Sequence, residues 1–297
     1  MIGFLKKVFR RKRSNASYVQ TAPLSVDQIK AVSKKEITLE PHQLIVGIGE
    51  SVGKQRDHNE DTVFVLNATL AGTSEGMPFG IFLVADGMGG HQNGEVASGI
   101  AARTIAAYLV QKLYFPFFSL KPESQGESFQ EIMRNAVLEA QQAVIKNVPG
   151  GGTTLTAAFV LGDQVTLAHV GDSRAYFIYP DGRMQAITRD HSLVKRLIEL
   201  GQITEKEAYV HPQRNVLYRA VGQGEPFEPD VNTFPLPHPG YLMLCTDGLW
   251  GVLPDIEVYR IINSASNPSM ACHELVEAAN AAGGPDNISV ILAYYPN

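Results

Sequence analysis

The feature that most constrains this chain is a short apolar segment that ends in a carboxylate. Residues 81–85 are Ile-Phe-Leu-Val-Ala, and Asp86-Gly-Met-Gly-Gly follows them. A short apolar run bounded by a turn signal predicts a buried strand. Because the glycines lack Cβ atoms, the backbone carbonyls after Asp86 could approach an ion closely. The motif alone also fits an aspartate that caps the following helix, so a site requires partners elsewhere in the chain.

Three other segments place carboxylates beside apolar runs. Asp247 follows one such run, and Asp286 precedes a β-branched one. Glu60 and Asp61 directly precede another. Carboxylates gathered at one rim repel each other unless a cation lies between them, and hard oxygen ligands favour magnesium, manganese or calcium over zinc. The pattern predicts a metal centre.

Eight motifs follow one another between about residues 43 and 295. They are Arg56-x-x-Asn59-Glu-Asp61, Asp86-Gly-Met-Gly-Gly90, Gly152-Thr-Thr154, Val170-Gly-Asp-Ser-Arg-Ala-Tyr176, Thr188-Arg-Asp-His-Ser192, Arg219-Ala-Val-Gly222, Thr246-Asp-Gly248 and Asp286-Asn287. In this order and spacing they resemble the motifs of the metal-dependent serine/threonine protein phosphatases of the 2C family, particularly its bacterial branch. One motif would be weak evidence, whereas eight in order are specific.

The resemblance implies an enzyme that hydrolyses phosphoserine and phosphothreonine in proteins. Two Mn²⁺ or Mg²⁺ ions would activate a bridging water for this reaction. By resemblance, Asp86 bridges the ions, and the Gly87 carbonyl and Glu60 bind one of them, partly through water. Asp247 and Asp286 hold the other ion.

Three more residues receive roles from the resemblance. Asp61 is expected to serve the metals through a water or from behind the direct ligands. Asn287, beside Asp286, is expected to orient a ligand. Arg56 is expected to position the substrate, because a guanidinium fork matches the oxygens of a phosphoryl group.

Two positions depart from the wider family. Met88 stands where some members carry a histidine that acts as general acid, and methionine cannot donate a proton. Pro149 stands three positions before Gly152, where relatives use an aspartate to help bind a third ion. We therefore expect two tightly bound ions, with any third ion appearing only at high metal concentration.

Other polar residues of the motifs are expected to be structural. Asp172 and Arg174 are predicted to pair with each other and stabilise a hairpin. The motif histidines are expected at the surface or in hydrogen bonds rather than in catalysis: His58, His169 and His191. Residues 193–218 resemble the family's mobile flap, which predicts a loop that selects substrates. The alternative is an ordered surface helix without a role.

Runs of strands joined by tight turns, with helices in pairs, predict an α+β domain with antiparallel sheets. Helical spacing of apolar residues occurs over residues 96–113, 129–144, 255–264 and 268–282. The resemblance refines this to a four-layer α-β-β-α sandwich, in which helix pairs flank two central antiparallel sheets. We expect a single phosphatase domain over residues 42–297 and a basic tail with a linker over residues 1–41.

Charge restricts the partners. The first 13 residues carry six basic and no acidic side chains, although the net charge of the chain is −5. The remainder is therefore acidic, which argues against nucleic acid as the main partner. Hydrophobic residues alternate with the basic ones in residues 1–13, so weak contact with an anionic membrane is one interpretation. A solvated tail is the favoured alternative.

Localisation and partners follow from what the chain lacks. No segment approaches the ~18 apolar residues of a membrane span, and no signal peptide is recognisable. We expect a cytoplasmic protein, with a peripheral position at the inner face of the membrane as an alternative. A disulfide between Cys245 and Cys272 is not expected. The expected partners are phosphoprotein substrates and an opposing serine/threonine kinase. A catalytically inactive scaffold with the same fold, and another two-metal hydrolase such as a nuclease, are the rival functions.

Overall fold

The structure is a computed structural model that describes residues 43–70, 77–89, 92–118, 126–224 and 226–296. The expected basic tail and linker, residues 1–41, lie outside the described residues. So does Gly90 of the glycine-rich motif.

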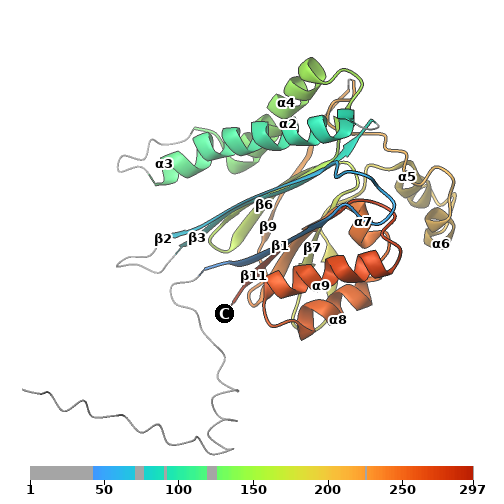
Figure 1. Ribbon diagram of the computed structural model, residues 1–297. Helices are drawn as coiled ribbons and strands as arrows, with labels where there is room; N and C mark the ends of the chain where they lie inside the picture. The colour runs from blue at the N-terminus through green and yellow to red at the C-terminus, as the bar shows by residue number, and fades with distance from the viewer. Residues whose placement is uncertain (1–42, 71–76, 90–91, 119–125, 225, 297) are drawn as a thin grey trace, which may run out of the picture. The chain divides into compact units, whose positions relative to one another are not determined.

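Two antiparallel sheets lie face to face and form the two inner layers of the fold (Figure 1). The first sheet has the strand order β1 (Ile45–Ser51), β11 (Ile288–Tyr295), β10 (Gly240–Cys245), β7 (Arg174–Ile178) and β8 (Met184–Ala186). The second has the order β2 (Asp61–Leu70), β3 (Met77–Met88), β5 (Leu155–Leu161), β6 (Gln164–Val170) and β9 (Asp230–Pro235), and β4 (Gly152–Thr153) pairs with the end of β3.

Helices form the two outer layers (Figure 1). The second sheet is covered by α2 (Gln92–Leu109), which continues into the π-helical segment η1 (Val110–Tyr114) and α3 (Phe115–Phe117), and by α4 (Phe129–Asn147). The first sheet is covered by α7 (Asp247–Trp250), α8 (Asp255–Ser264) and α9 (Pro268–Ala281). Between β8 and β9 lie the short helices α5 (Leu193–Glu199) and α6 (Glu205–Tyr209). The predicted four-layer α-β-β-α sandwich is thereby confirmed.

Strand β3 is central because both of its faces are buried. Phe82 and Val84 pack in the layer between the sheets. Ile81 and Leu83 alternate with them and pack under α2 and α4. Burying each such side chain stabilises the fold by roughly 1.5–3 kcal/mol. This burial on both faces explains the uninterrupted apolar run that precedes Asp86, and it confirms the predicted strand.

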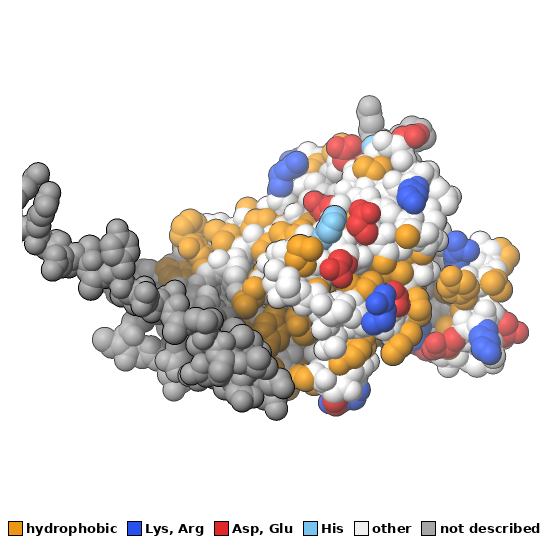
Figure 2. Space-filling view, turned by 60° about the horizontal axis from the view of Figure 1, so that its bottom comes forward, with side chains coloured by type: hydrophobic (Ala, Val, Ile, Leu, Met, Phe, Trp, Pro, Cys, Tyr) orange, Lys and Arg blue, Asp and Glu red, His pale blue; other side chains and the backbone are white. Residues whose placement is uncertain are grey.

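The structure bears on two further predictions from the sequence, the absence of a disulfide and the absence of a membrane-spanning segment. Cys245 and Cys272 are both buried and free, which confirms that they do not form a disulfide. Among the described residues, no helix combines the length and hydropathy needed to cross a bilayer. Figure 2 shows one face of the molecule, on which acidic and basic side chains are interspersed among hydrophobic ones.

Three elements were not anticipated in detail. Strand β9 escaped prediction because it is an edge strand that is partly exposed along its whole length, so it lacks a clear alternation of apolar residues. The five-residue helix α6 is defined by a Thr204–Glu207 capping box rather than by apolar spacing. The helix expected over residues 96–113 begins earlier, at Gln92, and its last turn is π-helical.

Candidate metal centre and adjoining cavity

The register of β2 and β3 brings the first two carboxylates together. Asp61 and Asp86 are directly opposite each other in this strand pair. The Asp86 amide donates to Thr154 Oγ1 at 2.9 Å, and the Thr154 amide donates to the Asp86 carbonyl at 2.8 Å. The backbone that carries the Asp86 carboxylate is therefore held on both sides.

Asp247 and Asp286 reach the same end of the sandwich on neighbouring strands of the first sheet. Asp247 opens α7 directly after β10, and Asp286 lies just before β11, which pairs with β10. A Cβ atom on Gly248 would lie 1.9 Å from the Asn287 carbonyl oxygen. Glycine at position 248 is therefore required for the close approach of these two turns.

Asn287 joins the segments that surround the carboxylates. Its Nδ2 donates to the carbonyls of Val52 and His58 at 2.8 and 2.9 Å, and its Oδ1 accepts from the Glu60 amide at 2.8 Å. In this structure Asn287 thus orients the segment that carries Glu60.

Glu60 and Gly87 lie beside the start of α2. The Gly87 amide donates to the Glu60 carbonyl at 3.1 Å, and Glu60 Oε1 lies 3.0 Å from His58 Nε2. A Cβ atom on Gly94 would lie 2.4 Å from Glu60 Oε2, so the first turn of the helix packs against this carboxylate.

Burial and neighbouring negative charges raise the pKa values of three of the clustered carboxylates. Burial raises the pKa of Asp86 well above its usual value, and the charges of Asp61 and Asp247 add to the rise. Burial chiefly raises the pKa of Asp61 to about 7. Burial and the charge of Asp286 raise the pKa of Asp247 to about 6, and a hydrogen bond with Asp86 opposes that rise. Each shift reports a site that disfavours negative charge in the absence of a compensating cation.

The guanidinium of Arg56 touches this group. Its Nη2 donates to Asp286 Oδ2 at 2.7 Å, and this hydrogen bond raises the pKa of Arg56. The Arg56 side chain is 49% exposed, so one half-solvated cation faces several carboxylates. Buried Asp61 accepts from Thr246 Oγ1 at 2.9 Å through Oδ2, while its Oδ1 has no hydrogen-bond partner among the described residues.

The cluster fits hard divalent cations, because all the side-chain atoms that it offers as metal ligands are carboxylate oxygens. Within the described residues, no three His, Cys, Asp or Glu side chains already form a closed ligand set. The ligand set that the sequence predicts also includes the Gly87 carbonyl and water. Gly87 lies next to Asp86 at the end of β3.

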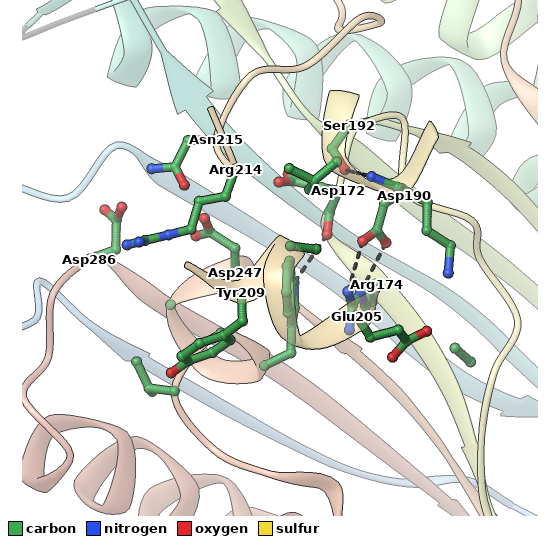
Figure 3. A pocket seen from close by; sticks show the side chains of 18 of the residues that line it. Asp172, Arg174, Asp190, Ser192, Glu205, Tyr209, Arg214, Asn215, Asp247 and Asp286 are labelled. Atoms are coloured by element: carbon green, nitrogen blue, oxygen red, sulfur yellow. Dashed lines mark hydrogen bonds and ion pairs between the residues drawn. The ribbon is translucent and has the colours of Figure 1, made fainter. Parts of the chain in front are cut away.

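A cavity of about 640 Å³ opens beside the carboxylates. Arg56, Asp247 and Asp286 line one side of it, and residues of α5, α6 and the following loop line another. Figure 3 shows Arg214 extending from that loop toward Asp247 and Asp286. The cavity is larger than a phosphoryl group needs, so it has room for neighbouring parts of a substrate.

The expected pairing of Asp172 with Arg174 is wrong. Arg174 instead donates twice to Asp190, from Nε at 2.9 Å and from Nη2 at 2.8 Å (Figure 3). Its guanidinium also lies 3.5 Å from the ring centre of Trp250, whose Nε1 donates to the Asp172 carbonyl at 3.1 Å. The position of Arg174 is therefore set by Asp190 and Trp250.

Asp172 is a carboxylate of the cavity that sequence analysis placed elsewhere. It is buried, and burial followed by the charge of Asp247 raises its pKa well above the usual value. The signal that could have identified it is its place in a turn directly after β6, which matches the position of the other carboxylates beside strands.

The two positions that depart from the family pattern, Met88 and Pro149, both lie in the part of the chain that the structure describes. Met88 is the last residue of β3 and is half-buried. Pro149 is exposed and lies after α4, in the turn that leads to β4. Neither residue adds a carboxylate or a proton donor to the cluster.

Comparison with known proteins identifies the family. The protein phosphatase 2C family model matches residues 47–288. A serine/threonine phosphatase Stp of Listeria innocua is 37% identical over 241 residues, covering 81% of this chain and 91% of that protein. The protein phosphatase PhpP of Streptococcus pneumoniae is 33% identical over 249 residues, covering 81% and 93% of the two chains.

A solved structure has the same fold. The catalytic domain of the serine/threonine protein phosphatase PstP, in complex with two manganese ions, superposes with a TM-score of 0.69 at 29% identity, over 86% of this chain and 99% of that one. The chain therefore belongs to the protein phosphatase 2C family and is by that membership an enzyme, a serine/threonine protein phosphatase.

Proposed function

We propose that the enzyme hydrolyses phosphoserine and phosphothreonine in proteins at a centre that takes two Mn²⁺ or Mg²⁺ ions. The observation that carries this proposal is the gathering of carboxylates beside the cavity: Asp61 and Asp86 lie opposite each other in β2 and β3, and the charges of Asp61 and Asp247 add to the rise that burial causes in the pKa of Asp86. Bound divalent ions would supply a nucleophilic water near neutral pH and offset charge on the phosphoryl oxygens.

The proposed ligands divide between two positions. Asp86 would help to hold both ions, the Gly87 carbonyl and Glu60 would hold the first, and Asp247 and Asp286 would hold the second. Asp61 lies beside Asp86 in the sheet and supports the cluster from its buried side. The PstP structure with two manganese ions supports the number of ions and one of the two metals.

Arg56 is proposed to orient the phosphoryl group. It lines the cavity and is half-exposed, and its present partner is a proposed metal ligand, Asp286. A guanidinium that loses this carboxylate to a divalent ion can turn its fork to phosphoryl oxygens, which have similar geometry.

The proposed substrates are phosphoproteins, which an opposing serine/threonine kinase would supply. We propose one catalytic domain over residues 42–297, supported by the family match to residues 47–288. Cytoplasmic location and contact of residues 1–13 with an anionic membrane stay predictions from the sequence.

The test uses the full chain with para-nitrophenyl phosphate and a phosphothreonine peptide. We expect turnover of both with Mn²⁺ or Mg²⁺, loss of turnover in excess chelator, and recovery when the metal is restored. Substantial turnover after thorough chelation would contradict the metal-dependent mechanism. Tight binding of Mn²⁺ by calorimetry without turnover of either substrate would instead favour the inactive scaffold.

A third ion is not proposed as a resident of this site. Pro149 offers neither a carboxylate nor an amide proton, so an ion at that position would rely on Asp247 and water. We expect calorimetric titration with Mn²⁺ to show two tight sites and any third only at high concentration. For Pro149→Asp we expect a tighter third site. A third tight site in the unaltered enzyme would show that another residue has replaced the missing aspartate.

A further inference from the structure

The flap, residues 193–218, joins the sandwich through two chain segments that lie side by side, residues 191–193 and 216–218, which we call the neck. The Leu193 amide donates to the Val216 carbonyl at 2.8 Å, and the Tyr218 amide donates to the His191 carbonyl at 2.9 Å. These bonds close the base of the flap as two short antiparallel segments. Between the flap and the carboxylate cluster lies the cavity described above, which is lined by Arg214 of the flap and by Asp247 of the cluster.

Few other hydrogen bonds hold the flap. Within the described residues, its remaining hydrogen bonds to the rest of the chain are those of Ser192 at the neck and the pair between Arg189 and Glu199 of α5. The Arg189 side chain is exposed, and exposed ion pairs contribute little. The direction of the flap is therefore set chiefly by the neck.

His191, at the start of the neck, is bound to Gly171 by two hydrogen bonds. The His191 amide donates to the Gly171 carbonyl at 2.7 Å, and the Gly171 amide donates back to His191 Nδ1 at 3.1 Å. Because Nδ1 accepts, the ring proton is assigned to Nε2, which lies 3.2 Å from Asp230 Oδ2. The ring is 2% exposed.

The Nε2 side of the His191 ring is held by residues after the flap and by neighbouring rings. Arg219, one residue past the flap, donates from Nη1 to Asp230 Oδ1 at 2.9 Å and thereby holds the carboxylate that faces His191; the same Nη1 lies 3.2 Å from His191 Nε2. The rings of His169 and Tyr218 lie at 4.9 and 5.6 Å from the ring centre of His191. The imidazole thus joins both ends of the flap to β9.

Gly171 is a firm attachment point. Its φ is +107°, and a Cβ atom there would lie 2.6 Å from Thr154 Cβ, so its backbone packs tightly on Thr154. Thr154 is the residue whose hydroxyl accepts from the Asp86 amide. The neck is consequently attached to the same strand ends that carry Asp86, a proposed metal ligand.

We infer that His191 is a positioning residue: by bonding Gly171 and Asp230 together, it sets the position of the flap over the cavity and so governs binding of a phosphopeptide rather than the hydrolytic step. His191 lies outside the lining of the cavity and touches none of the proposed metal ligands. The kinetic part of this inference rests on the proposed phosphatase function.

The first experiment compares two substrates of the Mn²⁺-loaded, full-length enzyme. His191→Phe keeps an aromatic ring but removes the polar contacts of both ring nitrogens. We expect KM for a phosphothreonine peptide to rise about tenfold, which corresponds to about 1.4 kcal/mol. We expect kcat for para-nitrophenyl phosphate to stay within about twofold, since His191 touches none of the residues proposed to carry out hydrolysis.

Two substitutions separate the contact of His191 Nδ1 with Gly171 from that of Nε2 with Asp230. The His191→Asn side chain can still accept from the Gly171 amide, so it should recover most of the peptide KM. Asp230→Asn removes the charge on the other side of the ring and should combine less than additively with His191→Phe, because both act on one contact. As a matched control, His211→Phe alters another flap histidine, which bonds only locally to the Gln213 amide, and should leave both substrates unchanged.

A second measurement does not depend on activity. Limited trypsin digestion reports opening of the flap, which contains Lys195, Arg196 and Lys206. His191→Phe should raise the rate of cleavage at these sites about tenfold without lowering Tm, and His191→Asn should restore protection. Unchanged cleavage together with an unchanged peptide KM would overturn the inference. So would a parallel fall in Tm and in turnover of both substrates, because that pattern describes a residue needed only for folding.

Discussion

At the scale of single residues, the Asp286 carboxylate can bind either the Arg56 guanidinium or a proposed metal ion, and the two cations compete for it. In the structure its Oδ2 accepts from Arg56 at 2.7 Å. Burial and neighbouring negative charges raise the pKa values of Asp61, Asp86 and Asp247. Divalent cations would remove that cost and release Arg56 from its role as local counter-charge.

Replacement of Asp247 by asparagine tests the metal assignment. Asp247→Asn removes one ligand charge, and we expect kcat to fall by about 10³-fold, equivalent to about 4 kcal/mol of transition-state stabilisation. Steady-state kinetics at saturating Mn²⁺ would measure this. Asp163→Asn, in the exposed turn after β5, is the matched control and should be silent. Near-normal turnover in Asp247→Asn would remove this carboxylate from the proposed ligand set.

Replacement of Arg56 separates substrate binding from metal binding. Arg56→Ala should lose most of the catalytic efficiency, because phosphoryl oxygens lose a bidentate donor. Its affinity for Mn²⁺ in calorimetry should be retained or improved, since the competing cation at Asp286 is gone. The reverse pattern, weak metal binding with normal kinetics, would make Arg56 a structural residue.

At the scale of elements, helix α9 is seated against β1 through glycines. A Cβ atom on Gly47 would lie 2.3 Å from the backbone of Pro268, the first residue of α9. A Cβ atom on Gly49 would likewise lie 2.8 Å from the Cys272 carbonyl oxygen. The close approach lets the apolar face of α9 pack on the first sheet, whose strands β10 and β11 lead to Asp247 and Asp286.

Gly47→Ala should therefore separate the helix from the sheet. Backbone atoms cannot move aside as a flexible side chain would, so we expect the free energy of unfolding to fall by about 2 kcal/mol or more. Urea denaturation followed by circular dichroism would measure it. Gly126→Ala is the control, because a Cβ atom there meets nothing within 4 Å, and it should change stability by less than about 0.5 kcal/mol. Equal stability of the two variants would contradict the packing argument.

At the scale of the whole molecule, all eight motifs lie within residues 47–288, the segment that the family model matches. Catalysis should therefore depend on this segment and not on the basic residues near the start of the chain.

Deletion of residues 1–41 tests that division. We expect the shortened chain to keep the Tm and the kcat of the full chain toward para-nitrophenyl phosphate. Flotation with vesicles containing anionic lipid would show whether residues 1–13 bind a membrane, and electrostatic binding should weaken at high salt. Loss of the folded state on deletion would show that the tail belongs to the domain.

Much of the architecture could be predicted because its signals are local. The apolar run before Asp86 identified β3, and helical spacing identified α4, α8 and α9 with bounds close to those observed. Edge strand β9 and the short helix α6 carry weak apolar patterns, so the same reasoning missed them. Local periodicity reports burial, and partly exposed elements provide little of it.

The sequence by itself determined which carboxylates stand beside strands and which family motifs surround them, because those features depend on neighbouring residues. Only the tertiary structure decided the partners. Arg174 bonds Asp190 rather than Asp172, and Arg56 reaches Asp286 across 230 positions of the chain. A turn motif does not specify the hydrogen-bond partner of its side chains when that partner lies on a distant segment of the chain. Strand register and the packing of glycines decide which side chains come within hydrogen-bond distance.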